Sequence, residues 1–181
     1  MKGFPISMRN PVVYPGPPPP DTDVVVIGGG VIGVCTALYL ARAGQRVTLL
    51  EKGRIAGEQS SRNWGWIRQQ GRDPAELPIM MEARRLWQDL AAETNEDFGL
   101  RQTGVTYLAE TGKTLASYEA WAGIAAAQGL DTRMLSPEEV AAMFPGLTRR
   151  YAGGMTTPSD MRAEPWLAVP VLAGIAARSG V

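Results

Sequence analysis

The sequence predicts an α/β protein that begins with a Rossmann-like dinucleotide-binding βαβ unit. Three observations indicate this fold. A β-branched apolar run over Asp23–Ile27 leads into a glycine-rich turn, an apolar helix-forming segment follows the turn, and a second apolar run over Arg46–Leu50 ends at Glu51. Strand, glycine turn, helix and strand in this order, within about 30 residues, are typical of dinucleotide binding.

The glycine turn has the spacing Gly-x-Gly-x-x-Gly at Gly28, Gly30 and Gly33. In this pattern the first glycine permits a tight turn and the second lets a pyrophosphate approach the backbone. The third lets the helix pack closely on the strand. A glycine pattern alone is weak evidence, but its position directly after a strand and before a helix makes the signal strong.

The helix after the turn is expected over Val31–Ala43, with Gly44 suited to end it. Its first N–H groups, those of Val31 and Ile32 included, should face the phosphates. Glu51 follows the last glycine of the motif by 51 − 33 = 18 residues. A carboxylate there can accept hydrogen bonds from the adenosine ribose, and it repels a 2′-phosphate, which argues against NADP.

The rest of the chain predicts a mixed second part after a polar, Gly-rich loop over 52–73. Apolar spacing and capping residues indicate its helices, and β-branched residues indicate its strands. The expected elements are a helix from Pro74 with Ile79, Ala83, Leu86 and Leu90 on one face, a strand over 103–109, a helix from Leu115 to about Gly129, a short helix capped by Ser136, Pro137 and Glu139, a strand over 151–156 and a helix over 165–178.

Two parallel strands leave a sheet with open edges and poorly covered faces. The last helix ends at 179–181, where a further strand would be expected. We therefore expect an incomplete fold, which is the N-terminal part of a larger protein that has been truncated or divided between two chains.

Composition excludes several classes of function. Lys and Arg together number 18, as do Asp and Glu, so the net charge of zero favours neither nucleic acid nor an anionic membrane as a partner.

Histidine is absent, which rules out Ser-His and Cys-His mechanisms and His-containing zinc sites within this sequence. Cys35 is the single cysteine, so no internal disulfide or thiolate metal cluster is expected. We interpret Cys35 as a packing residue and expect a reducing, cytoplasmic location.

One segment, 24–41, is apolar over 18 uncharged residues and approaches the length of a membrane span. Its glycines divide it into a strand and a helix, so no transmembrane segment is expected. The Pro-rich residues that precede it are expected to form an extended arm.

The loop after Glu51-Lys52 contains Ser60-Ser61-Arg62-Asn63-Trp64-Gly65. Together with the glycine motif, this stretch resembles the N-terminal portion of the D-amino-acid oxidase and sarcosine/glycine oxidase family of flavoproteins. The later Thr157-Pro158-Ser159-Asp160 stretch up to Pro165 is also similar to that family. The resemblance implies that FAD is the cofactor and that this loop wraps its pyrophosphate and flavin edge. The cofactor-binding residues expected on both grounds are Gly28, Gly30, Val31, Ile32, Gly33, Glu51, Lys52, Ser60, Ser61, Arg62, Asn63, Trp64 and Gly65.

The resemblance further implies oxidation of a C–N bond in an amine or amino acid, with hydride transfer to flavin N5. After the Pro-rich arm over 1–21, it implies the first part of the FAD domain over 22–78, a partial substrate region over 79–160 and a helix returning to the FAD domain over 161–181. The expected partners are a small amine or amino-acid substrate and a complementing C-terminal chain. Residues 1–181 alone should turn over substrate poorly.

Three residues are candidates for substrate contact. Arg68 and Arg72 can each grip a carboxylate through a bidentate guanidinium, although both can equally be polar residues at a helix entry. Trp66, like its neighbour Trp64, can cover the flavin or pack against a second domain. Trp87, Tyr107 and Trp121 lie at periodic positions and are assigned to the core.

Two other functions stay open. The chain can be a catalytically incomplete nucleotide-binding subunit or remnant that acts through a partner chain. It can also be an NAD-dependent dehydrogenase, which the loop over 60–65 disfavours. A yellow colour of the purified protein would indicate a bound flavin.

Overall fold

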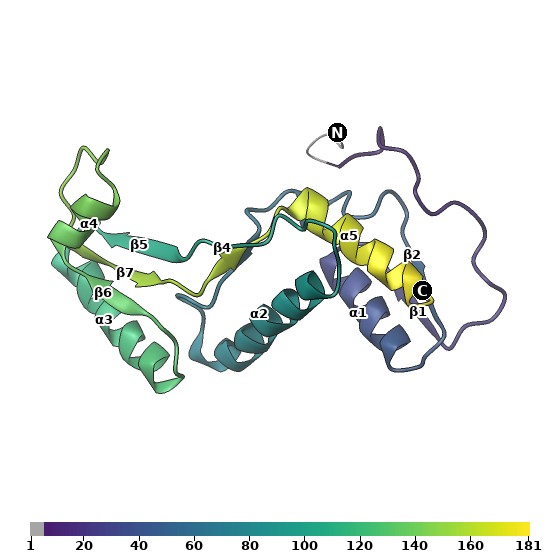
Figure 1. The fold of residues 1–181 in the computed structure, drawn as a ribbon, viewed down its shortest axis with the longest axis horizontal. Helices are drawn as coiled ribbons and strands as arrows, with labels where there is room; N and C mark the ends of the chain where they lie inside the picture. Colours follow the sequence, from purple (N-terminus) through teal and green to yellow (C-terminus); the bar gives the residue numbers. More distant parts are fainter. Residues whose placement is uncertain (1–5) are drawn as a thin grey trace. The chain divides into compact units, whose positions relative to one another are not determined.

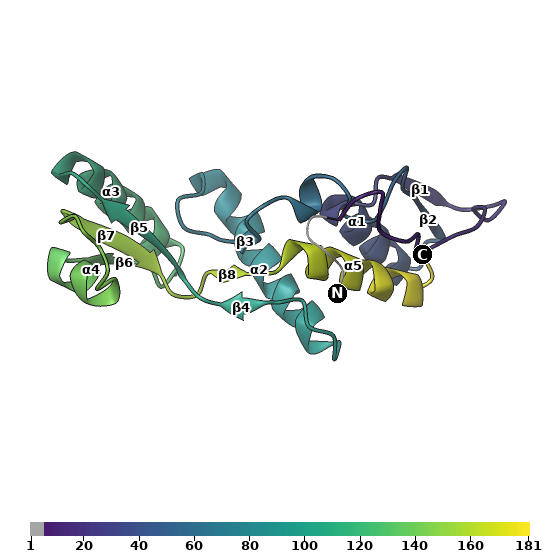
Figure 2. The same ribbon diagram turned by 90° about the horizontal axis from the view of Figure 1, so that it is seen from above.

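The computed structural model describes residues 6–181; Figure 1 and Figure 2 label its helices and strands. The predicted mixed α/β class is confirmed. The chain divides into two compact units, which are described separately. The first comprises the described residues up to Gly65, together with Thr94–Leu100 and Ala163–Val181, and the second comprises Trp66–Glu93 and Arg101–Arg162. The chain therefore leaves the first unit after Gly65, before the boundary at 78 expected from the sequence.

The first unit contains the predicted βαβ motif. Strands β1 (Val24–Ile27) and β2 (Val47–Leu50) pair in parallel, with Val24 opposite Val47, and helix α1 (Val31–Arg42) connects them. Helix α5 (Pro165–Arg178) packs along α1, as both views of the ribbon show. The apolar side chains buried on these two helices form the core of the unit: Val34, Ala37 and Leu38 of α1 and Ala168, Val169, Leu172, Ala173, Ile175 and Ala176 of α5.

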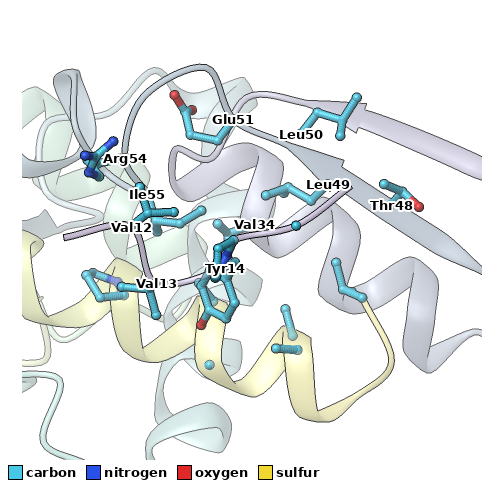
Figure 3. A pocket seen from close by; sticks show the side chains of 18 of the residues that line it. Val12, Val13, Tyr14, Val34, Thr48, Leu49, Leu50, Glu51, Arg54 and Ile55 are labelled. Atoms are coloured by element: carbon cyan, nitrogen blue, oxygen red, sulfur yellow. The ribbon is translucent and has the colours of Figure 1, made fainter. Parts of the chain in front are cut away.

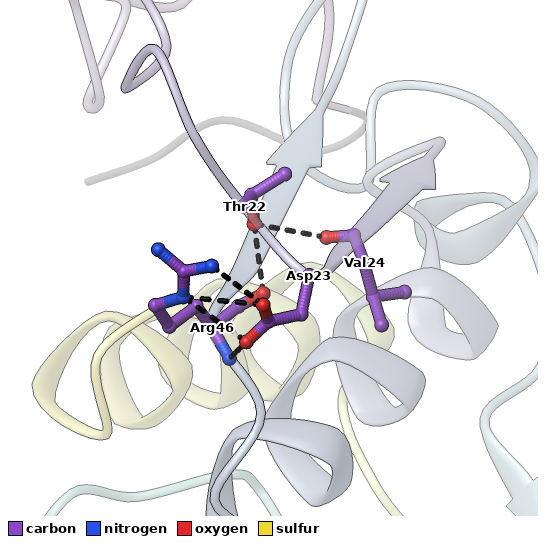
Figure 4. A network of polar contacts seen from close by, with 4 residues as sticks. All are labelled: Thr22, Asp23, Val24 and Arg46. Atoms are coloured by element: carbon purple, nitrogen blue, oxygen red, sulfur yellow. Dashed lines mark hydrogen bonds and ion pairs between the residues drawn. The ribbon is translucent and has the colours of Figure 1, made fainter.

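A polar network holds the starting ends of β1 and β2 together (Figure 4). The Asp23 carboxylate accepts hydrogen bonds from the backbone N–H and the guanidinium of Arg46, and the Thr22 hydroxyl donates to the Arg46 carbonyl at 2.7 Å. The hydrogen bond from the Arg46 side chain lowers the pKa of Asp23 to about 2. The stabilisation from this ionised carboxylate is present above its ordinary pKa and is lost as pH falls through about 2.

The second unit contains two small sheets. The first has the order β3 (Trp66–Ile67), β8 (Met161–Arg162), β4 (Arg101–Gln102), and the second has the order β5 (Val105–Ala109), β7 (Gly153–Thr157), β6 (Arg133–Leu135); all pairs are antiparallel. Helix α2 (Leu77–Ala92) packs against β3.

Two helices cover the β5-β7-β6 sheet, α3 (Gly112–Ala127) and α4 (Pro137–Met143). All five residues of the central strand β7 are buried. A Cβ added at Gly153 would meet Leu115 of α3, and one added at Gly154 would meet Val140 of α4. Successive residues of a strand face opposite sides, so the two helices lie on opposite faces of the sheet (Figure 2).

The local signals in the sequence predicted where α1, α4 and α5 begin. The capping box of α4 is confirmed: the Ser136 hydroxyl accepts from the Glu139 N–H at 3.2 Å, and the Glu139 carboxylate accepts from the Ser136 N–H at 2.8 Å. Gly44 follows α1 with a φ of +84°, as expected of a helix-ending glycine.

Several other expectations differ from the structure. Pro74 opens a 3₁₀ turn (Pro74–Glu76) ahead of α2, and Ile79 is exposed, although Leu90 of the same predicted face is buried. The short strands β3, β4, β6 and β8 were not predicted. Trp87, Tyr107 and Trp121 are partly buried rather than enclosed in the core. Within residues 6–181, no helix combines the length and the apolar character needed to cross a membrane.

Candidate dinucleotide site

The glycine turn joins β1 to α1, and in it the backbone at the start of α1 passes very close to the backbone at the end of β1. Gly28 has a φ of +110°, a conformation that glycine adopts without strain, and its N–H donates to the Leu50 carbonyl at 2.8 Å. A Cβ built on Gly33 would lie 1.9 Å from the Gly28 carbonyl oxygen. The third glycine of the motif is therefore required so that the first turn of α1 can pass against the end of β1.

Gly30 precedes α1 and contributes no side-chain cap to the helix. Its φ of −79° and ψ of 178° are open to any residue, so backbone conformation does not explain the glycine. A Cβ at Gly30 would instead lie 2.9 Å from Ser60 Oγ. The first N–H groups of a helix have no intrahelical acceptor and carry partial positive charge, so this terminus suits an anion, and glycine leaves the space between it and Ser60 free of a side chain.

Ser60 reaches this terminus from the loop after β2. The Val31 N–H donates to Ser60 Oγ at 2.9 Å, so a hydroxyl distant in sequence takes the place of an N-cap side chain. Ser60 belongs to the turn η1 (Gln59–Ser61), which packs on α5. Ser60 thus brings one residue of the predicted loop to the N-terminus of α1.

Glu51, at the end of β2, clamps the glycine turn. Its carboxylate accepts from the Gly29 N–H at 2.7 Å and from the Gly53 N–H at 2.6 Å. These two contacts were not predicted from the sequence, although Gly29, which lies outside the Gly-x-Gly-x-x-Gly positions, and Gly53 were available signals. A carboxylate has about four acceptor sites, so Glu51 can still accept from ribose hydroxyls.

The remaining predicted residues of the loop make mainly local contacts. Arg62 donates to the Glu58 carboxylate and the Gly57 carbonyl, and Asn63 donates to the Gln59 carbonyl while accepting from the Gly65 N–H. The Ser61 hydroxyl is fully buried and finds no hydrogen-bond partner in the described part of the chain. Lys52 is exposed, and Trp64 is 79% exposed.

A cavity of about 770 Å³ lies in the same unit, beside Glu51 (Figure 3). Its walls come from the arm over 11–19, from β2, from Val34 of α1 and from α5. The glycines of the Gly-x-Gly-x-x-Gly motif do not line it. The cavity therefore adjoins the ribose end of the candidate site and is separate from the helix terminus where a pyrophosphate would lie.

In the second unit, a buried carboxylate organises the segment that holds the catalytic candidates. Asp160 is fully buried and accepts from the Gln69 N–H at 2.7 Å and from the Gln70 N–H at 3.1 Å. Burial raises the pKa of the Asp160 carboxyl, and the hydrogen bonds from Gln69 and Gln70 offset part of the rise. A raised pKa stabilises the fold most below the carboxyl's ordinary pKa, and this contribution falls as pH rises through the shifted value.

Arg68 and Trp66 lie together with Tyr107 in this unit. The Arg68 guanidinium carbon is 5.6 Å from the Trp66 ring centroid and 6.0 Å from that of Tyr107, and the guanidinium donates to the Gln70 carbonyl. The ion pairs of the described residues do not include Arg68. Arg68 is thus held by aromatic rings and a carbonyl, which leaves its charge unneutralised.

Arg72 contacts other residues of the second unit through both its side chain and its backbone. Its guanidinium lies 3.8 Å from the Glu76 carboxylate, and its carbonyl accepts from the Trp121 indole N–H at 2.9 Å. Of the two arginine candidates, Arg72 therefore has a carboxylate partner among the described residues, and Arg68 has none.

No cluster of three or more His, Cys, Asp and Glu side chains suited to a metal occurs in residues 6–181. Burial raises the pKa of the Cys35 thiol on α1 to about 11, which disfavours a thiolate at neutral pH. The open helix terminus at Gly30 and the carboxylate at the end of β2 fit the pyrophosphate and ribose of a dinucleotide.

Comparison with protein-family models decides which dinucleotide this is. The family described as "FAD dependent oxidoreductase" (DAO) matches residues 23–181. The chain belongs to this family. Its cofactor is FAD, and the flavoprotein resemblance noted in the sequence is confirmed.

Individual relatives agree with this assignment. The chain is 31% identical over 170 residues to glycine oxidase of Geobacillus kaustophilus, a match covering 87% of this chain and 44% of the relative. It is 28% identical to the mitochondrial pyruvate dehydrogenase phosphatase regulatory subunit of Mus musculus, covering 90% of this chain and 19% of that protein.

Among solved structures, L-amino acid deaminase of Proteus myxofaciens superimposes with a TM-score of 0.88 at 30% identity, covering 96% of this chain and 40% of the deaminase. The chain thus spans less than half the length of each of these relatives.

Proposed function

We propose that this protein acts through FAD in oxidising the C–N bond of an amine or amino acid. The observation that carries the proposal is the open N-terminus of α1 at Gly30, bounded by Ser60 and by Glu51, in a chain of the FAD-dependent oxidoreductase family. The names of two relatives, glycine oxidase and L-amino acid deaminase, specify amino acids as the molecules on which those proteins act.

The geometry of the first unit supports a proposed set of cofactor-binding residues. The N–H groups at the start of α1 are proposed to bind the pyrophosphate, with Gly28, Gly30 and Gly33 shaping the turn. Glu51 is proposed to accept from the ribose while holding Gly29. The other members of the proposed set are Val31, Ile32, Lys52, Ser60, Ser61, Arg62, Asn63, Trp64 and Gly65. FAD, when bound, supplies the hydride acceptor for the oxidation.

The identity of the cofactor tests this proposal first. We expect purified protein to bind FAD and turn yellow, and chromatography of the released cofactor to identify FAD rather than NAD. We also expect amino acids to bleach the flavin of residues 1–181 only slowly under anaerobic conditions. Ile27 and Ile32, on either side of the glycine turn, are 86% and 78% exposed, so this side of the site is open to water. Access of water weakens the electrostatic preorganisation that hydride transfer needs.

Two outcomes of that experiment would contradict the proposal or part of it. A colourless protein that binds NAD with a higher affinity than FAD would remove the flavoprotein assignment. Rapid bleaching by an amino acid would show that residues 1–181 suffice for the chemistry. As a control, FMN should bind more weakly than FAD, because it lacks the adenosine that Glu51 is proposed to contact.

Arg68 is proposed to bind the substrate carboxylate, with Trp66 as a wall of the same region. We expect Arg68→Leu to raise KM for an amino acid by about tenfold more than for the matching simple amine, because a charge-assisted contact of roughly 1.5 kcal/mol or more would be lost. Arg72→Leu is the matched control, since Arg72 is paired with Glu76 and should not change that preference. Equal changes for both substrates in Arg68→Leu, measured with a preparation that turns over substrate, would exclude the role.

A second candidate function is a nucleotide-binding subunit that acts through a partner chain. The similarity to a phosphatase regulatory subunit favours it. This function predicts tight FAD binding with no bleaching by any amine or amino acid, even when a complementing chain is added. A cytoplasmic location stays a prediction based on the single cysteine, and the similar regulatory subunit is mitochondrial by name.

A further inference from the structure

The described part of the N-terminal arm, residues 6–20, lies against the first unit without forming a helix or strand. Ile6 is 4% exposed, and a turn follows it in which the Asn10 N–H donates to the Ser7 carbonyl and the Ser7 N–H donates to the Asn10 side chain. Beyond this turn the arm is exposed, Val12, Val13 and Tyr14 included, and it forms one wall of the cavity (Figure 3). The arm is therefore fixed mainly at its turn.

One side chain connects that turn to the rest of the unit. The Arg54 guanidinium donates from Nε to the Asn10 carbonyl at 2.5 Å, from Nη2 to the Met8 carbonyl at 3.2 Å and from Nη1 to the Gly53 carbonyl at 2.8 Å. A planar guanidinium presents five N–H donors in a fixed geometry, which a lysine ammonium cannot reproduce. Arg54 thus joins the arm and the loop after β2 through three carbonyl groups.

That loop is the one that clamps the glycine turn. Gly53, whose carbonyl Arg54 binds, donates its N–H to Glu51. The Ala56 N–H donates to the Gly29 carbonyl at 2.9 Å, with Ala56 in a strained conformation at a φ of +60°. Met8 Sδ would lie 3.3 Å from a Cβ built on Gly53, so the arm also packs directly on the loop.

We propose that the N-terminal arm is a structural part of the dinucleotide site and that Arg54 is a positioning residue for Glu51. By attaching the arm to the 51–57 loop, Arg54 holds the loop in the conformation in which Glu51 contacts Gly29. A binding loop that is already ordered loses less conformational entropy when its ligand binds, and the ligand then binds more tightly. The proposal rests on the FAD function above. The effect of Arg54 on the order of the 51–57 loop can nevertheless be measured in protein without FAD.

The first test measures loop order in FAD-free protein by trypsin cleavage after Lys52. We expect Arg54→Ala to speed this cleavage about tenfold, and Arg54→Lys to give an intermediate rate because it keeps the charge but not the planar fork. Arg9→Ala is the matched control, because Arg9 is an exposed arginine of the same arm and should leave the rate unchanged. Equal cleavage rates in Arg54→Ala and Arg9→Ala would overturn the proposal.

The second test measures FAD affinity by fluorescence titration. Arg54→Ala should weaken binding about tenfold, and removal of residues 1–20 should weaken it by a similar factor. The two changes combined should be no worse than either alone, because each removes the same arm-to-loop attachment. Additive losses, or unchanged FAD affinity in Arg54→Ala, would overturn the proposal while leaving the FAD function intact. If the unmodified protein binds no FAD, the FAD function fails and the cleavage rates still decide the role of Arg54.

Discussion

A Gly30→Val variant is expected to lose FAD binding almost completely while keeping its fold. The backbone at Gly30 has an ordinary extended conformation, so a branched side chain is tolerated there by the main chain. Its Cβ would instead enter the space at the N-terminus of α1 and lie 2.9 Å from Ser60 Oγ. We expect affinity to fall by a factor of about 100 or more, which corresponds to roughly 3 kcal/mol. Fluorescence titration with FAD measures it, and circular dichroism verifies the fold.

Two further variants calibrate this result. Ser60→Ala removes the hydroxyl that the new Cβ would approach but adds no side chain to the phosphate space. We expect it to lower FAD affinity less than Gly30→Val does, which would show that Gly30→Val acts by blocking that space rather than by disturbing Ser60. Glu51→Ala should weaken binding by about 10- to 100-fold, because charge-assisted hydrogen bonds of roughly 1.5–3 kcal/mol are lost. Affinities equal to that of the unmodified protein in both Gly30→Val and Glu51→Ala would contradict the dinucleotide site.

A Gly33→Val variant is expected to fail at an earlier stage and not form the native first unit. A Cβ on Gly33 would lie 1.9 Å from the Gly28 carbonyl oxygen, a separation that no pair of non-bonded atoms adopts, and neither atom belongs to a flexible side chain. Helix α1 would have to move away from β1 and expose the apolar side chains buried beneath it. We expect loss of cooperative thermal unfolding and loss of amide-exchange protection in α1.

Gly174→Ala on α5 is the matched control for that variant. Its Cβ would lie 3.5 Å from an Arg178 nitrogen and 4.0 Å from the Tyr14 hydroxyl, which are ordinary contacts. Alanine also favours a helix over glycine by about 0.8–1.0 kcal/mol, so this variant should unfold at the same or a slightly higher temperature. Native melting and exchange protection in Gly33→Val would show that the close approach of α1 to β1 is not required.

The candidate site could be predicted in part because its signals are local. The spacing of Gly28, Gly30 and Gly33 between a strand and a helix determines where an anion-binding helix terminus forms, and Glu51 marks the end of the next strand. The loop residues 60–65 were found by resemblance to a family rather than by any pattern of spacing. Of these, Ser60 accepts a hydrogen bond from the helix terminus, and its position depends on how the loop folds back.

The short strands could not be predicted because each depends on a partner distant in sequence. Strands β3, β4 and β8 have two residues each, which is too short for an alternating pattern to be recognised. Their pairing joins Trp66 to Arg162 and Arg101 to the same Arg162. The early break after Gly65 has the same cause, since the chain crosses into another sheet where the sequence shows only a polar loop.

The sequence by itself determined the α/β class, the βαβ unit and the dinucleotide motif, because periodicity, glycine spacing and capping residues act within a few turns or strands. Tertiary structure alone decided that Glu51 holds Gly29 and Gly53, that Asp160 organises Gln69 and Gln70, and that Arg54 attaches the N-terminal arm. Each of these contacts places a charged group on backbone N–H or carbonyl groups. Every residue carries such groups, so no side-chain pattern in the sequence marks the partners, and they are found only when folding brings the segments together.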